Sequence, residues 1–285
     1  MGFASVGEYA AASEAGQTWL STWRKSPSQA TTIGIWFDLS MSPGQPVPQY
    51  YASAPGVAAP MAYTDQQGMF AGHSVAPATK HLARLTVMSS VATALPMPMM
   101  LCDYLLYYPF IDEGTTDEQI LDNTAPLPRY ASGEGVRMMA VSVAGRTGGQ
   151  SFTVSYTNSA GVAGRTTGPV VQNSVSLIGS IVTSNRAVAA ARGPFLPLQA
   201  GDTGVRSIDS VTMAGADVGL FTLVLVKPLA QLQLRGVDAP VEANYLTDFG
   251  QLPTIVDDAY LNFLACPSGS LAATALHGDI TVVWN

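Results

Sequence analysis

The sequence predicts a mainly β protein, with a β-sandwich or jelly-roll-like body that follows an N-terminal helix and an extended proline-rich arm. Short segments that alternate between apolar and polar residues, or run apolar, recur along most of the 285 residues. The 27 glycines and 19 prolines are spread out, as turns between short strands require. A chain of this length with 47% hydrophobic residues can bury a full core.

The chain opens with the features of a helix. Ser5 and Glu8 have the spacing of a capping box, in which a hydroxyl and a carboxylate bond free amides of the first turn. Apolar and small residues then recur at helical spacing, and two basic residues stand where the helix dipole favours cations. We therefore expect a helix from about Val6 to Arg24. Trp19 and Trp23 would share one stripe, buried in the core or against a neighbouring subunit.

A strand and a proline-rich segment come next. Residues 32–39 have the pattern of a strand, whereas five prolines between residues 42 and 60 forbid a central strand and favour extended chain. Tyr50 and Tyr51 lie within this segment. Ordered loops of this length are uncommon in compact domains. We expect an arm that lies on another chain, and the alternative is a loop packed on its own domain.

Strand patterns dominate the remainder of the chain. Phe152, Val154 and Tyr156 alternate on one face of a strand at 151–157, which a turn at 158–161 follows. Residues 97–108 are apolar on both faces, as in a central strand. Weaker patterns predict a short helical turn at 115–121 and strands at 82–89, 136–143, 174–183, 207–213, 220–226 and 280–284.

The chain divides loosely into an N-terminal part and a body. Residues 1–80 hold the helix, the first strand and the arm, and residues 81–285 form the β-rich body, with a soft internal boundary near 132–135. No clean linker separates the two parts. We therefore expect one closely packed unit rather than independent domains.

One short sequence echo occurs within the body. Residues 143–148 (VAGRTG) recur at 162–168 (VAGRTTG), on either side of the 151–157 strand. Matched turns at the ends of neighbouring strands would place Arg146 and Arg165 in similar exposed positions. A single pair is too little for a repeat architecture, so chance or convergent turn chemistry is the alternative.

The charge pattern limits the partners. The net charge of −7 and the lack of a basic cluster argue against a nucleic-acid surface. The strongly apolar segment at 220–226 is too short to cross a bilayer, so no membrane partner is expected. Only 12% of residues are charged, against about 25% in ordinary domains. We expect part of the surface to be covered by other protein chains, and a homo-oligomer. The alternative is the codon bias of a GC-rich genome.

The residues predict no enzymatic chemistry, no metal site and no cofactor. The glycine-rich stretch 145–149 lacks the lysine and hydroxyl residue of a phosphate loop. The adjacent acidic pairs at 112–113 and 257–258 are expected to be solvated turn residues. Cys102 and Cys266 are expected to be buried free thiols, and the alternative is a disulfide between them. The remaining enzymatic alternative is a hydrolase with a dispersed site, which would depend on residues such as His277 and Asp279.

Four stretches together resemble structural proteins of tailed-bacteriophage virions: 103–112 (DYLLYYPFID), 145–149 (GRTGG), 201–208 (GDTGVRSI) and 276–280 (LHGDI). The resemblance spans most of the chain but includes no mechanistic motif. It implies a β-rich, non-enzymatic component of the virion, with capsid decoration (cement) at the capsid surface as the favoured role. The implied partners are the major capsid protein, other virion proteins and further copies of the chain.

The resemblance defines no site, so interface residues are chosen from aromatic and arginine side chains, which are enriched at protein interfaces. The interface hypothesis consists of Trp19, Trp23, Tyr50, Tyr51, Arg146 and Arg165. Two alternative functions stay open. One is a tail or head–tail connector protein, and the other is a glycan-binding module of a fibre.

Overall fold

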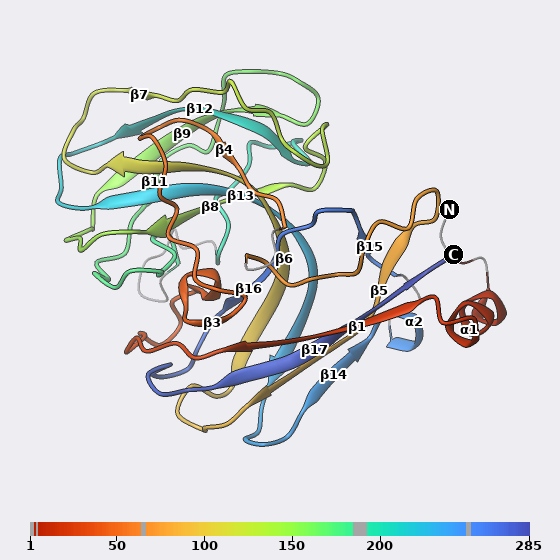
Figure 1. Cartoon of the computed structure of the whole chain (residues 1–285). Coiled ribbons are helices and arrows are strands. Elements are labelled where there is room, and N and C mark those ends of the chain that lie inside the picture. Colours follow the sequence, from red (N-terminus) through yellow and green to blue (C-terminus); the bar gives the residue numbers. More distant parts are fainter. Residues whose placement is uncertain (1–2, 4, 64–66, 185–192, 249–251) are drawn as a thin grey trace.

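The computed structural model describes residues 3, 5–63, 67–184, 193–248 and 252–285, and in this part the chain is mainly β, as predicted (Figure 1). Its strands pair antiparallel in three sheets, which we call the terminal, central and distal sheets. The terminal sheet holds the first and last strands of the chain, in the order β14 (Val241–Asn244), β5 (Lys80–Ser89), β17 (Leu276–Trp284), β1 (Thr18–Lys25) and β3 (Gly44–Gln45), with β15 (Thr254–Ile255) also paired to β5.

The central sheet connects the two ends of the molecule. Its order is β2 (Phe37–Asp38), β16 (Leu261–Ala265), β6 (Met97–Asp112), β13 (Leu220–Leu234) and β8 (Arg137–Ser142), with β4 (Ala59–Pro60) also paired to β6. The strands β6 and β13 are 16 and 15 residues long and pair along almost their whole length. In Figure 1 these two strands run from the terminal sheet to the distal sheet. The predicted central strand at 97–108 is confirmed.

The distal sheet covers the far half of the long pair formed by β6 and β13, which we call the central ribbon. Its order is β10 (Arg165–Thr166), β9 (Ser151–Asn158), β12 (Val205–Met213) and β7 (Gln119–Ile120), with β11 (Val170–Val171) also paired to β9. The alternation predicted for β9 is confirmed, because Phe152, Val154 and Tyr156 are each at most 1% exposed. These side chains belong to the same apolar cluster as Tyr108 and Leu223 of the central ribbon.

Two other apolar clusters complete the sandwich-like body. One lies between the terminal sheet and the near half of the central ribbon, and includes Leu85, Leu101 and Ile280. The other covers the opposite face of the ribbon, around Tyr104 and Val224. The central sheet is therefore buried on both faces, which explains why the sequence of β6 is apolar without alternation.

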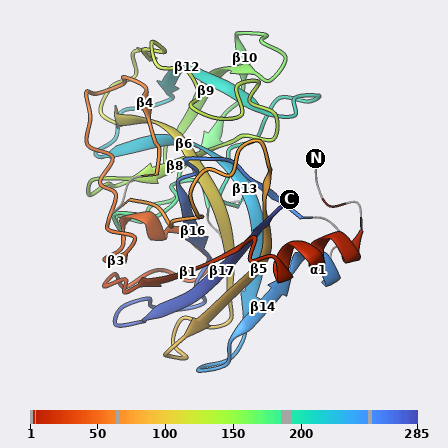
Figure 2. The same ribbon diagram turned by 45° about the vertical axis from the view of Figure 1, so that its right-hand side comes forward.

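The first helix is shorter than predicted. Helix α1 spans Val6–Glu14, and the Ser5 hydroxyl accepts a hydrogen bond from the Glu8 amide, as the capping box predicts. Gly16 then adopts φ +76°, and the amides of Gly16 and Gln17 bond the carbonyls of Ser13 and Ala12 in a Schellman motif that ends the helix. Figure 2 shows α1 near the chain termini, where it packs on the terminal sheet.

The prediction of a helix as far as Arg24 is therefore wrong, because residues 18–25 form strand β1. Beyond Gly16 the side chains follow a period of two: Trp23 points into the core, where its ring lies 4.4 Å from that of Phe263, whereas Leu20 is exposed. Strand β1 pairs with β17 along its whole length. The two tryptophans thus lie on a strand rather than on a helix.

The proline-rich segment lies along its own body. Its residues contribute β3 and β4 to the terminal and central sheets, and the 3-10 helix η1 (Leu39–Met41) precedes it. Tyr51 is fully buried beside Tyr107 on the outer face of the central sheet. The packed-loop alternative describes this arrangement. Strands from residues 1–80 share sheets with strands from 81–285.

Three further expectations are wrong. Within 32–39 only Phe37 and Asp38 are in a strand, and 174–183 is a loop in which Asn173 donates to the Ile181 carbonyl. The segment 115–121 contains β7 rather than a helical turn, and α2 (Tyr245–Asp248) lies elsewhere. The other predicted strands are present. No helix among the described residues is long and apolar enough to span a membrane.

Candidate functional site

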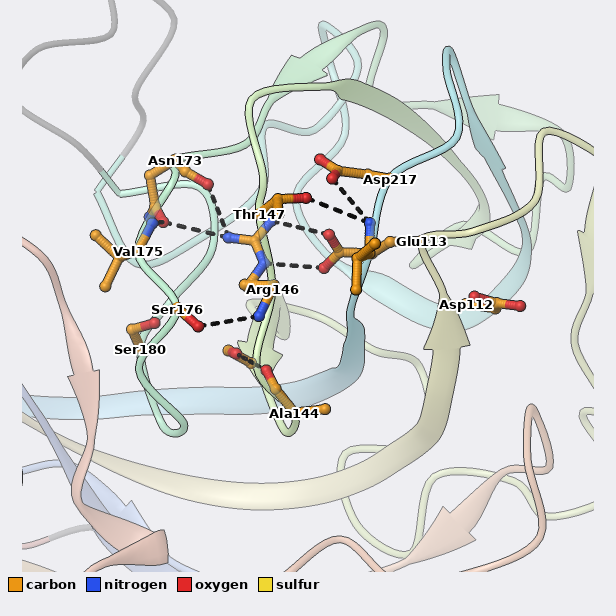
Figure 3. A network of polar contacts seen from close by, with 12 residues as sticks. Asp112, Glu113, Ala144, Arg146, Thr147, Asn173, Val175, Ser176, Ser180 and Asp217 are labelled. Carbon is orange, nitrogen blue, oxygen red and sulfur yellow. Dashed lines mark hydrogen bonds and ion pairs between the residues drawn. The ribbon is translucent and has the colours of Figure 1, made fainter.

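Arg146 is buried in an ion pair. Its guanidinium donates to Glu113 at 2.9 and 3.3 Å and to the Asn173 carbonyl at 2.8 Å, and neither charged side chain is exposed to solvent. Figure 3 shows the guanidinium between Asn173 and Glu113. Burial raises the pKa of Glu113, and the Arg146 charge and hydrogen bonds oppose that shift. The expectation of an exposed Arg146 is wrong, as is that of a solvated Glu113.

Arg165 occupies the matching place in the sequence echo but a different environment. Its side chain is 25% exposed and donates to Asp202 at 3.0 Å. Asp202 also accepts hydrogen bonds from Tyr156 and Asn158. The Arg165 hydrogen bond, with those of Tyr156 and Asn158, lowers the pKa of Asp202 to about 2. The two arginines therefore share a local sequence, and each pairs with a carboxylate of its own, but they differ in exposure.

A second buried network fixes the proline-rich segment. The Asp38 carboxylate accepts hydrogen bonds from the hydroxyls of Tyr51 and Tyr104 and from Ser40. Nearby, the Lys25 ammonium donates to the backbone carbonyls of Ser40, Ser42 and Pro46. Burial lowers the pKa of Lys25 to about 8, and Asp38 opposes this shift. Tyr51 is therefore an internal anchor of this segment and is not available at a surface.

A third network lies across the central sheet. Arg129 donates to Asp103 at 3.0 and 2.7 Å and also to the carbonyls of Met61 and Tyr104. The planar Arg129 guanidinium therefore links β6 to the segment around Met61. Lysine could not supply this bidentate contact with the Asp103 carboxylate. Together these networks place several of the chain's few charges inside the molecule.

Of the six proposed interface residues, three remain accessible. Tyr50 is 67% exposed, Trp19 is 38% exposed and Arg165 is partly exposed, whereas Trp23, Tyr51 and Arg146 are buried within the chain. The structure does not gather the accessible three into one cluster of contacts. Other large apolar side chains are also exposed, among them Ile120, Val218, Val6 and Leu20.

A cleft at the edge of the terminal sheet combines aromatic and acidic side chains. It has a volume of about 410 Å³ and is lined by Tyr63, Phe70, Ala71, Gly72, His73, Ser74, Lys80, Val256, Asp257, Asp258 and Ala259. The first six come from the connection between β4 and β5, Lys80 begins β5, and the rest lie between β15 and β16. The sequence alone does not indicate this cleft, because its walls come from segments almost 200 residues apart.

The acidic wall of the cleft is held in place by a buried lysine. Lys80, 3% exposed, forms an ion pair of 2.8 Å with Asp257, and Ser74 donates to the same carboxylate at 2.6 Å. The hydrogen bonds from Lys80 and Ser74 lower the pKa of Asp257. Asp257 is an exposed turn residue, as expected, and it is also held in an ion pair. Asp258 beside it is exposed, in agreement with that expectation.

The thiols match the sequence interpretation in part. Cys102 and Cys266 do not form a disulfide with each other, and only Cys102 is fully buried. Burial raises the pKa of the Cys102 thiol well above its ordinary value. Among the described residues, no group of three or more histidine, cysteine or acidic side chains is placed to hold a metal ion.

Comparisons with known proteins identify no family. No model of a known protein family matches the chain, and no curated protein does. Among solved structures, a mutant VP2 protein of infectious bursal disease virus aligns with 94% of this chain and 78% of its own, at 10% identity and a TM-score of 0.19. A match at this level supports no statement about fold or function.

Proposed function

We propose that the chain is a non-enzymatic structural protein of a tailed-phage virion, and that it acts as a capsid decoration protein. It would stabilise the shell through contacts with the major capsid protein and with further copies of itself. The resemblance of the four sequence stretches supports the virion assignment. The distribution of charge and apolar surface supports an assembly role.

The observation that carries the proposal is the burial of charged side chains in ion pairs inside the molecule. The ion pairs of Lys80, Arg129, Arg146 and Arg165 each include a side chain at most 3% exposed. In a chain with only 12% charged residues, each buried charge further reduces the small number that can solvate the surface. Large apolar side chains remain exposed at the same time. Such a surface favours burial against other protein chains.

The accessible aromatic side chain on the proline-rich segment is the residue we assign to the interface. Tyr50 is 67% exposed, while Tyr51 next to it anchors the segment to the body. A rigidly held segment presents its side chains at little entropic cost on binding. Exposed tyrosines are also common energetic centres of interfaces.

Removal of residues 1–60 does not test this assignment, because it also deletes β1 and the buried network around Asp38. A point substitution does. Wild-type protein is expected to co-sediment at high copy number with shells of the cognate major capsid protein, and Tyr50→Ala is expected to weaken that binding by at least about tenfold. Asp258→Asn, which changes an exposed residue of the cleft, serves as the control with unchanged binding.

Two results would contradict the decoration role. A protein that remains monomeric and ignores shells has no decoration function. A stoichiometry of six or twelve copies per particle, measured by quantitative gel analysis of purified virions, would instead indicate a tail or head–tail connector protein.

A further inference from the structure

The cleft at the edge of the terminal sheet has one aromatic wall. The Phe70 ring lies 5.2 Å from that of Tyr63 and 5.0 Å from that of His73, measured between centroids. Trp19 supports Phe70 from behind at 5.2 Å. Ser21 of β1 bonds both the Phe70 carbonyl and the Trp19 indole, which fixes the wall to the sheet. The aromatic surface is thus formed before any ligand arrives.

The opposite wall is polar and acidic. All donors of Lys80 are directed to Asp257 and to the carbonyls of Gly72 and His73, so its charge is already neutralised within the protein. Among the described residues, the Asp258 carboxylate and the His73 ring nitrogens form no hydrogen bond or ion pair with the protein. Both side chains are exposed and belong to the lining of the cleft. They are therefore available to a ligand.

These two walls select the chemistry of the ligand. The carboxylates of Asp257 and Asp258 disfavour an anionic ligand, because the charge of Lys80 is already paired with Asp257. A wholly apolar ligand would strip water from the carboxylates without replacing their hydrogen bonds. A sugar ring matches both walls, because one face carries C–H groups and the edge carries hydroxyls. The volume of about 410 Å³ is within the usual range of small-molecule sites.

We propose that this cleft binds a saccharide ring, with the C–H face on Phe70 and Tyr63 and the hydroxyls bonded to Asp257, Asp258 and His73. A charge-assisted bond from a sugar hydroxyl to a carboxylate supplies orientation, and the aromatic contact supplies apolar burial. This binding activity goes beyond the proposed structural role and does not depend on it. A decoration protein with such a site would also attach particles to glycan surfaces.

The test is saturation-transfer NMR of the full chain with glucose, galactose, mannose and N-acetylglucosamine and their common disaccharides, followed by titration of the best ligand. Wild-type protein is expected to transfer saturation to ring C–H protons. Asp258→Asn is expected to weaken binding roughly 10- to 100-fold. Asp258 has φ +59°, a conformation that asparagine tolerates well, so this variant keeps the backbone.

Two further variants complete the experiment. Phe70→Ala is expected to abolish saturation transfer, and Tyr50→Ala, outside the cleft lining, is the matched aromatic control with unchanged transfer. Absence of transfer from every sugar overturns the proposal, as does equal binding by wild type and Asp258→Asn. Binding of tetramethylammonium in place of sugars would also overturn it and identify a cation site. Asp258→Asn is expected to bind shells as the wild type does. A loss of sugar binding in this variant is therefore distinguishable from a loss of the structural role.

Discussion

The two copies of the sequence echo provide a matched measurement of what burial does to an ion pair. Arg146 and Arg165 have the same local sequence and each pairs with a carboxylate. We consider the substitutions Arg146→Met and Arg165→Met, which remove the charge and keep much of the side-chain volume. The prediction is a large loss of unfolding free energy at residue 146 and a small one at residue 165.

The magnitudes follow from exposure and from the partners that remain. Arg146→Met leaves Glu113 fully buried without its cation, and such a change costs about 3–5 kcal/mol. Asp202 is only 3% exposed, but it keeps its bonds from Tyr156 and Asn158 and its arginine is partly solvated, so Arg165→Met costs less, about 1–2 kcal/mol. The double substitution Arg146→Met with Glu113→Leu is expected to recover much of the loss, because no buried charge is left unpaired.

The assay is equilibrium urea unfolding, with the free energy extrapolated linearly to water. The dependence on pH is a second signature. Without Arg146, burial raises the pKa of Glu113 further above its unfolded value, so the folded state binds more protons. The stability deficit of Arg146→Met relative to the wild type therefore shrinks as pH falls from 8 toward 5. Equal losses at the two arginines, or a double variant no more stable than Arg146→Met, would refute the reasoning.

Three other predictions concern the buried tyrosines and the thiols. Tyr51→Phe removes a hydroxyl bonded to buried Asp38 and is expected to cost about 1–3 kcal/mol in urea unfolding, while Tyr50→Phe is neutral. Burial raises the pKa values of Tyr156 and Tyr245 to about 12, so the folded state keeps protons that the unfolded state releases near pH 10. Stability measured by urea unfolding should therefore fall as pH rises through 10, and a stability that does not fall over this range would contradict the prediction. A thiol reagent should label Cys266 in the native protein and Cys102 only after denaturation, because Cys102 is buried; mass spectrometry of the labelled peptides checks it.

Alternation and apolar runs in the sequence were sufficient to predict most of the long strands. In β9, Phe152, Val154 and Tyr156 had to face one side, since a strand offers only two faces. The helix start was also readable, because the bonds of the Ser5 cap are local. The helix end was readable in principle: Gly16 is a common terminator, but Trp19 and Trp23 fit both a helical and a strand period and favoured the wrong choice.

Tertiary structure alone decided the roles of the charged and aromatic residues. The same turn sequence holds a buried arginine at Arg146 and a partly exposed one at Arg165, because Glu113 and Asp202 come from different parts of the chain. Likewise, adjacent Tyr50 and Tyr51 differ in exposure because one of them reaches Asp38. The cleft joins Phe70 to Asp258 across nearly 190 residues. Local sequence sets backbone preference and periodicity, whereas burial and pairing depend on contacts between segments that only the folded sheets bring together.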